Sequence, residues 1–201
     1  GKVDGAIDFN GDADYVDVGS DSVLNINNNF TISAWIKTSD TDPMGVVAWG
    51  EDAAGKRRSL LIWDGGSGDN KVYFSGYLGS ANLGGTSAVD DNQWHHIVVT
   101  LDSSNDASIY VDGVQENSGS VSLNSYTYSG SYIGATPLIG DAADENFDGI
   151  IDNVQISNTA RSAAWIKASY HSGNDTLLTT ATAEIGPGPV GYWSFDEGYS
   201  T

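Results

Sequence analysis

The stretch from Phe30 to Lys37 constrains the fold most, because it alternates apolar and polar side chains. Phe30, Ile32, Ala34 and Ile36 fall on one face, and a period of two indicates a β-strand with one buried face. Similar short segments recur at 6–9, 15–18, 45–49, 60–63, 72–74, 95–101, 108–111 and 149–156. Clusters of Gly, Asn, Asp and Ser separate them, as expected for turns.

Many short strands with regular turn signals predict a sandwich or a barrel rather than an α/β fold. Asp112-Gly113 follows one such strand and predicts a two-residue hairpin turn, because both residues tolerate positive φ. One short helix is expected near 162–169, with Ser162 as its N-cap. The 201 residues contain no Cys, so the core must be stable without disulfides, which a domain of this length allows.

The acidic balance limits the partners. Asp and Glu number 27 against 8 Lys and Arg, for a formal net charge of −19. Nucleic acid is a poor partner, since phosphate contacts need Lys and Arg. Calcium suits loop carboxylates, and a saline habitat is the alternative explanation of the acidic surface. No apolar run approaches the length of a membrane span, so no membrane insertion is expected.

The composition changes after the predicted helix. Residues 177–189 are rich in Thr, Ala, Gly and Pro and predict a linker between a domain at 1–176 and a final segment at 190–201. The final segment contains the apolar stretch 190–195, with three aromatic residues and a valine. Its aromatic side chains need a buried environment.

Four motifs occur in a fixed order over about residues 1–172. They are GAIDFNGDADYV at 5–16, FTISAWIK at 30–37, WHHIVVT at 94–100 with IYVDG at 109–113, and YIG at 132–134 with FDGIIDNV at 147–154. Together they resemble the laminin-G-like family of concanavalin A-like domains. The resemblance implies an all-β, antiparallel two-sheet jelly roll. It also implies an extracellular or cell-surface binding module rather than an enzyme.

The resemblance further implies that a strand of the type Tyr-Trp-x-Phe-Asp-Glu precedes the first motif. The matching residues of this chain, 192–197, lie at the other end. Three explanations remain open: the segment opens the next repeat of an array, folds back on its own domain, or inserts into a neighbouring molecule. The leading hypothesis is an adhesive or structural module that self-associates head to tail, with Tyr192, Trp193 and Phe195 as the strand-exchange interface.

Members of the family often hold one structural ion, and the resemblance implies a calcium site here. Its ligands would be Asn10, Asp12, Asp14 and Asp152, completed by Asp196 and Glu197 of the tail. Hard oxygen ligands from separate segments suit calcium. The alternative is that Asn10-Gly11-Asp12 is only a turn and that Asp152 only accepts hydrogen bonds from backbone amides.

The second hypothesis is a carbohydrate-binding module of a larger secreted protein. Its candidate glycan contacts are Trp49, Trp63, Tyr73 and Tyr77, although aromatic residues of alternating strands are as often core residues. The third hypothesis is a glycoside hydrolase.

Three further features bear on these hypotheses. A hydrolase would need a carboxylate pair, for which Asp148 and Asp152 are the candidates. The adjacent His95 and His96 point to opposite faces of a strand, so one is expected to be packed and the other exposed. Asn29-Phe30-Thr31 and Asn174-Asp175-Thr176 are potential glycosylation sequons.

Overall fold

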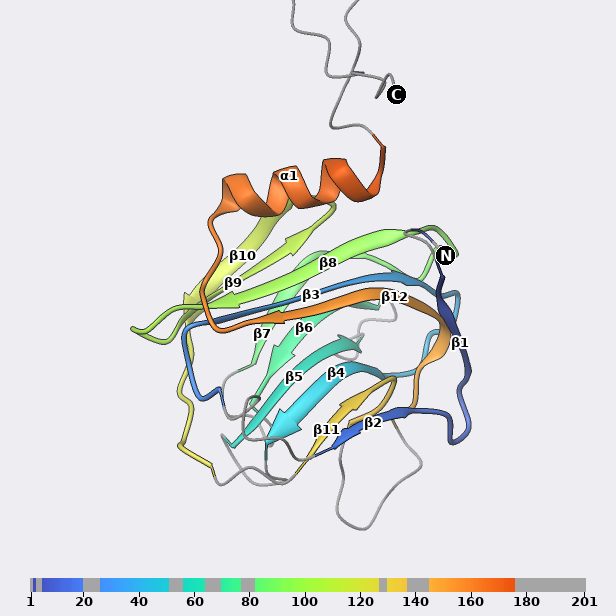
Figure 1. Cartoon of the computed structure of the whole chain (residues 1–201), viewed down its shortest axis with the longest axis horizontal. Coiled ribbons are helices and arrows are strands. Elements are labelled where there is room, and N and C mark those ends of the chain that lie inside the picture. Colours follow the sequence, from blue (N-terminus) through green and yellow to red (C-terminus); the bar gives the residue numbers. More distant parts are fainter. Residues whose placement is uncertain are drawn as a thin grey trace, which may run out of the picture.

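The computed structural model describes residues 2, 5–19, 26–50, 56–63, 70–76, 82–126, 130–136 and 145–175. In this part of the chain two six-stranded antiparallel sheets pack face to face, with one helix on the outside (Figure 1). The first sheet has the order β1-β12-β3-β8-β9-β10 and the second has the order β2-β11-β4-β5-β6-β7. The predicted two-sheet jelly roll is confirmed.

Along the chain, β4–β7 follow one another in the second sheet and β8–β10 in the first, whereas the strands before and after them switch between the sheets. Their bounds are β1 Ile7–Asn10, β2 Val16–Gly19, β3 Phe30–Lys37, β4 Met44–Gly50, β5 Arg57–Trp63, β6 Lys71–Ser75, β7 Leu83–Ala88, β8 His95–Leu101, β9 Asp106–Val111, β10 Val114–Ser120, β11 Ser131–Ile133 and β12 Asp148–Ser157. The helix α1 spans Ala163–Gly173. Strands of this length joined by turns are typical of a sandwich.

Strand β3 lies at the centre of the first sheet and is buried on both faces. Phe30, Ile32, Ala34 and Ile36 face the core between the sheets, as predicted. The opposite face is also covered, because α1 packs there and the ring of Trp35 stacks on that of Tyr170, with centroids 5.7 Å apart. The prediction of one polar face was therefore wrong for β3, since the helix supplies a second apolar layer.

Helix α1 begins at the predicted cap and runs four residues past the predicted end. The Ser162 side chain accepts the backbone N–H of Trp165 at 3.3 Å. The helix buries Ile166 against Val98 and Tyr110 of the first sheet. Its last turn continues to Gly173 because Tyr170 packs on the sheet.

The hairpin turn at Asp112-Gly113 is confirmed, with φ values of 50° and 77°. Strand β7 was not predicted, because its sequence LGGTSA has little strand propensity. Its Gly84 makes room for an aromatic ring, since a Cβ there would lie 2.6 Å from Cε1 of Tyr73. Packing against β6, rather than intrinsic propensity, places this segment in the sheet.

Candidate functional site

The edge of the sandwich between β7 and β10 is closed by side chains of β10. Oε2 of Glu116 accepts the backbone N–H groups of Thr86 and Ser87 on β7, at 2.8 and 3.2 Å. Nδ2 of Asn117 donates to the Gly84 carbonyl at 2.7 Å. Free strand edges otherwise pair with other chains, so these contacts protect this edge.

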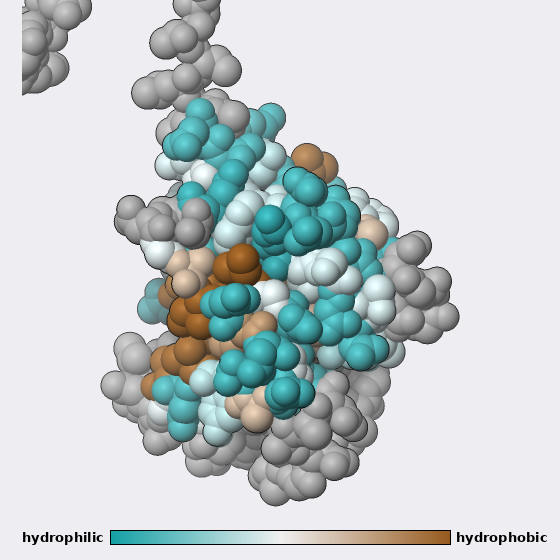
Figure 2. All heavy atoms as spheres, turned by 90° about the vertical axis from the view of Figure 1, so that its right-hand side faces the viewer, coloured by the Kyte–Doolittle hydropathy of each residue, from teal (hydrophilic) through white to brown (hydrophobic). Residues whose placement is uncertain are grey.

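The opposite edge, formed by β1 and β2, leaves core-facing side chains uncovered. Phe9 is buried, but Ile7, on the same side of β1, is 50% exposed. Val16 packs against the core, but Val18, on the same side of β2, is 43% exposed. Figure 2 shows an apolar patch on this face of the molecule. Core-facing positions of this kind are normally covered, so the sandwich formed by the described residues is open along this edge.

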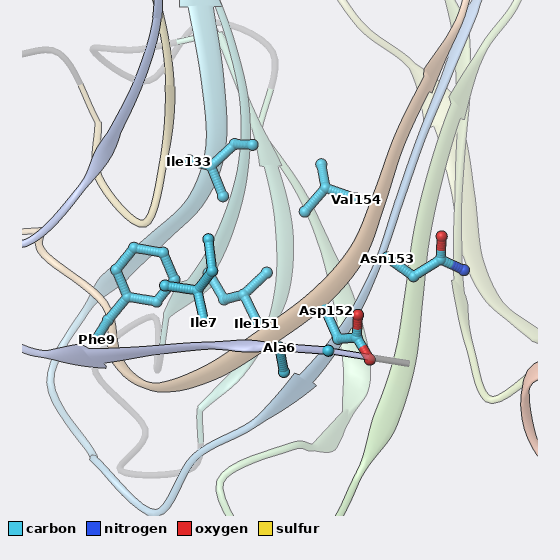
Figure 3. Close-up of a pocket in the computed structure, with 9 residues that line it drawn as sticks. Ala6, Ile7, Phe9, Ile133, Ile151, Asp152, Asn153 and Val154 are labelled. Carbon is cyan, nitrogen blue, oxygen red and sulfur yellow. The ribbon is translucent and has the colours of Figure 1, made fainter. Parts of the chain in front are cut away.

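A groove of about 390 Å³ lies at the open edge. It is lined by Gly5, Ala6, Ile7, Phe9, Ile133, Ile151, Asp152, Asn153 and Val154. Figure 3 shows Ile7, Phe9, Ile151 and Ile133 on one side of β12, with Asn153 pointing away from them. Walls from β1, β11 and β12 make the groove a gap between the two sheets, with aliphatic sides and one carboxylate at its rim.

The backbone of β12 is only half paired on the side of this groove. β1 pairs with β12 from Asp148 to Ile151, whereas β3 pairs with it on the other side as far as Ser157. Within the described part of the chain, residues 153–157 have no strand partner on the β1 side. Figure 1 shows β12 continuing past β1 towards α1. A strand edge of this kind is the template for strand addition.

A β-bulge at Asn153 determines which side chains in the second half of β12 face the core. The register between β12 and β3 shifts between Asp152 and Gln155, and Asn153 has a φ of 46°. The extra residue rotates the strand, so that Val154 and Ile156 pack against the core. Asn tolerates positive φ better than most residues. The free edge therefore carries apolar side chains towards the groove.

Residue Lys2 connects the rim of the groove with the end of α1. Its backbone N–H donates to Oδ2 of Asp152 at 2.7 Å, and its Nζ donates to Oδ1 of Asn174 at 2.6 Å. The same Nζ lies 5.1 Å from the ring centroid of Trp35. The C-terminal end of α1 thus lies one side chain away from the open edge.

The predicted calcium ligands are not brought together. Asn10 pairs with Asp148, at one end of the β1–β12 ladder, whereas Asp152 follows the other end, about 13 Å away along the strand. Oδ1 of Asn10 accepts the N–H of Asp12 at 3.0 Å. The described residues contain no group of three acidic or His side chains that could hold a metal ion.

These contacts match the alternative reading of the acidic residues. Asn10-Gly11-Asp12 forms a turn, with Gly11 at φ 77°, and Asp152 accepts a backbone N–H. The full predicted ligand set does not fit one ion. Asp14 is exposed, and Asp196 and Glu197 lie outside the described residues.

The four predicted glycan contacts separate into different environments. Trp49 is 1% exposed and packs on Phe30 in the core, with centroids 5.2 Å apart, so it is not available to a surface ligand. Trp63 is 36% exposed, and its ring lies 5.2 Å from that of Tyr73 on the outer face of the second sheet. Tyr77 lies outside the described residues. Trp63 and Tyr73 form an aromatic pair open to solvent.

The two adjacent histidines have opposite surroundings. His96 is 2% exposed between Trp35 and Tyr170, and burial lowers its pKa to about 4. The hydrogen bond from Nδ1 of His95 to Asp112, 2.9 Å long, raises the pKa of His95. His95 is not fully exposed, because its side chain is only 14% accessible. The predicted split between a packed and an outer histidine holds.

Two buried arginines at the start of β5 were not predicted. Arg58 donates to the carbonyl oxygens of Asn27 and Asn124 at 2.9 and 3.1 Å and lies 4.9 Å from the ring of Tyr126. Burial lowers its pKa to about 10, so it stays charged at neutral pH. Arg57 lies 3.5 Å from Glu145. The strand was predicted to begin at residue 60, whereas β5 begins at Arg57, and arginine is rarely buried.

The remaining predicted residues are placed as follows. Asn29 has a φ of 56° and accepts the N–H of Ala160 at 3.3 Å. Asn174 is the C-cap of α1. The predicted linker at 177–189 and the interface residues Tyr192, Trp193 and Phe195 lie outside the described residues. No helix among the described residues is long and apolar enough to cross a membrane.

The family model described as "Concanavalin A-like lectin/glucanases superfamily" matches residues 10–167. A curated relative, the non-toxic nonhemagglutinin of Paraclostridium bifermentans, is 31% identical over 126 residues, or 56% of this chain. The chain spans only 10% of the length of that protein. The match therefore covers a small part of that protein and not its full length.

Two solved structures are similar in fold. Domain 4 of AbnA, an extracellular arabinanase from Geobacillus stearothermophilus in complex with arabinotriose, has a TM-score of 0.62 at 18% identity and covers 83% of this chain and 77% of its own. The CBM40 of the Ruminococcus gnavus IT-sialidase bound to alpha2,3 sialyllactose has a TM-score of 0.62 at 13% identity and covers 82% and 96%. At these identities the likeness concerns the fold alone.

Proposed function

Because this chain belongs to the concanavalin A-like lectin/glucanases superfamily, we propose that it is an extracellular, non-catalytic binding module that associates with other copies of itself or with neighbouring repeats. The association uses strand addition: residues 190–197 of one unit supply a strand that another unit lacks. Trp193 and Phe195 fall on one side of such a strand, so both can enter an apolar groove together.

The observation that carries this proposal is the contrast between the two edges. The β7–β10 edge is closed by Glu116 and Asn117, whereas the β1–β2 edge exposes Ile7 on a core-facing position. Burying two aromatic side chains there removes apolar area worth about 25 cal/mol per Å², and a strand also satisfies free backbone groups.

Peptide binding tests the proposal. A chain that ends at residue 189 should bind a synthetic peptide of residues 190–201, and the binding should be lost when the peptide carries Trp193→Ala and Phe195→Ala. Sedimentation should show that concentrated full-length chain forms oligomers and that the shortened chain does not. Failure of the native peptide to bind would refute strand donation.

Glycan binding is a second candidate, supported by the exposed aromatic pair of Trp63 and Tyr73. Sugar rings stack on exposed aromatic faces, and the two similar structures contain arabinotriose and alpha2,3 sialyllactose. A glycan array probed with the native chain and with Trp63→Ala tests it. Val114→Ala is the matched control, because Val114 is exposed on a different edge strand. Equal signals from all three chains would exclude this site.

Hydrolysis is not proposed. Asp148 and Asp152 are four residues apart on β12, which separates their backbones by about 13 Å. Glycosidase carboxyl groups lie roughly 5 to 9.5 Å apart across the scissile bond. Asp152 also accepts the backbone N–H of Lys2. The spacing of the pair along β12 therefore does not favour glycosidase chemistry.

Calcium remains a proposal with a smaller ligand set. Asp152 lines the groove, and Asp196 and Glu197 directly follow the apolar part of the tail. A tail in the groove could bring these acids together, without Asn10, Asp12 or Asp14. Carboxylates from two segments suit calcium.

A further inference from the structure

We propose that His96 is an acid-sensitive latch for α1: protonation of its ring releases the helix from the first sheet while the two sheets stay folded. Release uncovers an apolar surface formed by Trp35, Val98 and Tyr110, which α1 covers at neutral pH. The inference goes beyond the proposed function, because it concerns the outer face of the first sheet and not the partner of the module.

Three stacked rings form the latch. The His96 ring lies between Trp35 of β3 and Tyr170 of α1, with centroids 5.1 and 6.3 Å away, and His96 is 2% exposed. The Trp35 and Tyr170 rings also stack on each other, at an interplanar angle of 23°. Nδ1 of His96 has no hydrogen-bond partner in the described structure. A proton on this nitrogen is therefore buried without an acceptor, which disfavours the closed contact.

The nearby carboxylates are engaged elsewhere. Asp112 lies opposite His96 on the neighbouring strand, but its Oδ1 accepts the backbone N–H of His96 at 2.9 Å. Its Oδ2 lies 2.9 Å from Nδ1 of His95. Asp152 lies beyond Trp35 on β12 and accepts the backbone N–H of Lys2. The charge of Asp112 favours a protonated His96, but burial of the ring has the larger effect and opposes it.

The remaining titratable groups around the contact are bases and phenols. Lys2 places its Nζ over the Trp35 ring, and Lys167 of α1 lies beside Gly113. His171 contacts the Tyr170 ring, with centroids 5.2 Å apart. Tyr110 packs beside Val98 under Ile166. None of these groups is an anion at neutral pH, so none of them neutralises an imidazolium at this position.

Helix α1 is held by a small apolar cluster of its own. Ile166 is the buried side chain of α1, and it packs with Val98 and Tyr110, with Trp165 beside them. This cluster is separate from the core between the two sheets. Losing it leaves that core intact, so α1 can open at a lower free-energy cost than the whole domain.

The two ends of α1 are attached differently. Before the helix, Oγ1 of Thr31 donates to the Thr159 carbonyl at 2.7 Å and accepts the Arg161 N–H at 2.9 Å. After it, the attachment is the bond from Nζ of Lys2 to Oδ1 of Asn174, 2.6 Å long. The latch lies at this second end, because Tyr170 is in the last turn. Release therefore pivots α1 about the Thr31 anchor and breaks the Lys2 bond.

The expected size follows from proton binding to the open and closed forms. Burial lowers the pKa of His96 to about 4, against 6.5 for an exposed ring. The open form, in which the ring meets water, therefore binds the proton at a higher pH than the closed form. The equilibrium constant for opening of α1 should rise about twenty-fold between pH 7 and pH 5.

Amide hydrogen exchange of the full chain at pH 7 and pH 5 tests the latch, after correction for the effect of pH on intrinsic exchange rates. The amides of the second half of α1 should show the twenty-fold rise in opening, and those of β5 in the second sheet should change less. In His96→Phe the opening of α1 should be the same at both pH values. His171→Gln is the matched control and should keep the response, because this histidine contacts Tyr170 without lying between the stacked rings.

An equal rise in α1 and β5 would mean that acid opens the whole domain, and it would overturn the latch. Unchanged exchange of α1 at pH 5 would overturn it as well. NMR titration of His96 in the native chain decides the matter even where His96→Phe does not fold. A pKa near 6.5 with α1 still protected would refute the latch, since the two rings would then hold the imidazolium by cation–π attraction; a pKa well below 6.5 is the expected result.

Discussion

Replacing His96 by Phe should remove most of the loss of stability that this domain suffers on mild acidification. His96 is buried between the rings of Trp35 and Tyr170, with centroids 5.1 and 6.3 Å away. Its Nδ1 has no hydrogen-bond partner within the described structure. The site therefore holds a neutral ring, and a proton is bound more easily after unfolding.

The magnitude follows from the two pKa values. Burial lowers the pKa of His96 to about 4 in the folded chain, against 6.5 in the unfolded chain. The unfolded state binds the proton at a higher pH than the folded state. The contribution of His96 to the free energy of unfolding is therefore present above pH 6.5 and is lost as the pH falls towards 4. The loss is about 2 kcal/mol between pH 7 and pH 5 and about 3 kcal/mol by pH 4.

Other groups titrate in the same range, so the variant must be compared with the native chain. The pKa of His95 is raised by its hydrogen bond to Asp112. The contribution of His95 to the free energy of unfolding is therefore present below pH 6.5 and is lost as the pH rises through its pKa in the folded chain. Its pH dependence is opposite in sign to that of His96. Both chains contain His95 and the same carboxylates, so these contributions cancel in the difference between them.

Urea unfolding at pH 7 and at pH 5 measures this difference. Phe is close in size to His and keeps the stack with Trp35, so the variant should fold. The native chain should lose about 2 kcal/mol more than His96→Phe between the two pH values. Equal losses in both chains would refute the assignment of the acid sensitivity to His96.

Three further predictions concern the cap, the first strand and the ion. Ser162→Ala removes the side chain that accepts the Trp165 N–H and should cost about 1 kcal/mol, measured by urea unfolding against Ser172→Ala; no change would mean that this cap is not used in solution. Gly134→Ala should destabilise the domain by roughly 1–3 kcal/mol, because Gly134 has a φ of 81° and a Cβ there would lie 2.4 Å from Cε1 of Phe9; a stable variant with protected β1 amides in hydrogen exchange would contradict this. Calcium should raise the melting temperature of the full chain more than that of a chain ending at 189, since the proposed ligands Asp196 and Glu197 lie in the tail; equal responses in calorimetry would exclude the tail as a source of ligands.

Local sequence was sufficient for most strands and for the start of the helix. The alternation in Phe30–Lys37, the Asp112-Gly113 turn and the Ser162 cap each depend on neighbouring residues only. Their periodicity and φ preferences are properties of the chain itself. The resemblance carried by four ordered motifs was sufficient for the family.

Tertiary structure alone determined the features on which the function depends. Asp152 was predicted to lie with Asn10, but the ladder between β1 and β12 places the two at opposite ends. Trp49 and Trp63 both lie near the end of a strand. Trp49 is buried because its side chain faces the core between the sheets, whereas Trp63 is exposed because its side chain points to the outer face. The free edge of β12 arises because β1 ends its pairing at Ile151 while β3 continues to Ser157. Strand pairing is a relation between distant segments, so local periodicity does not contain it.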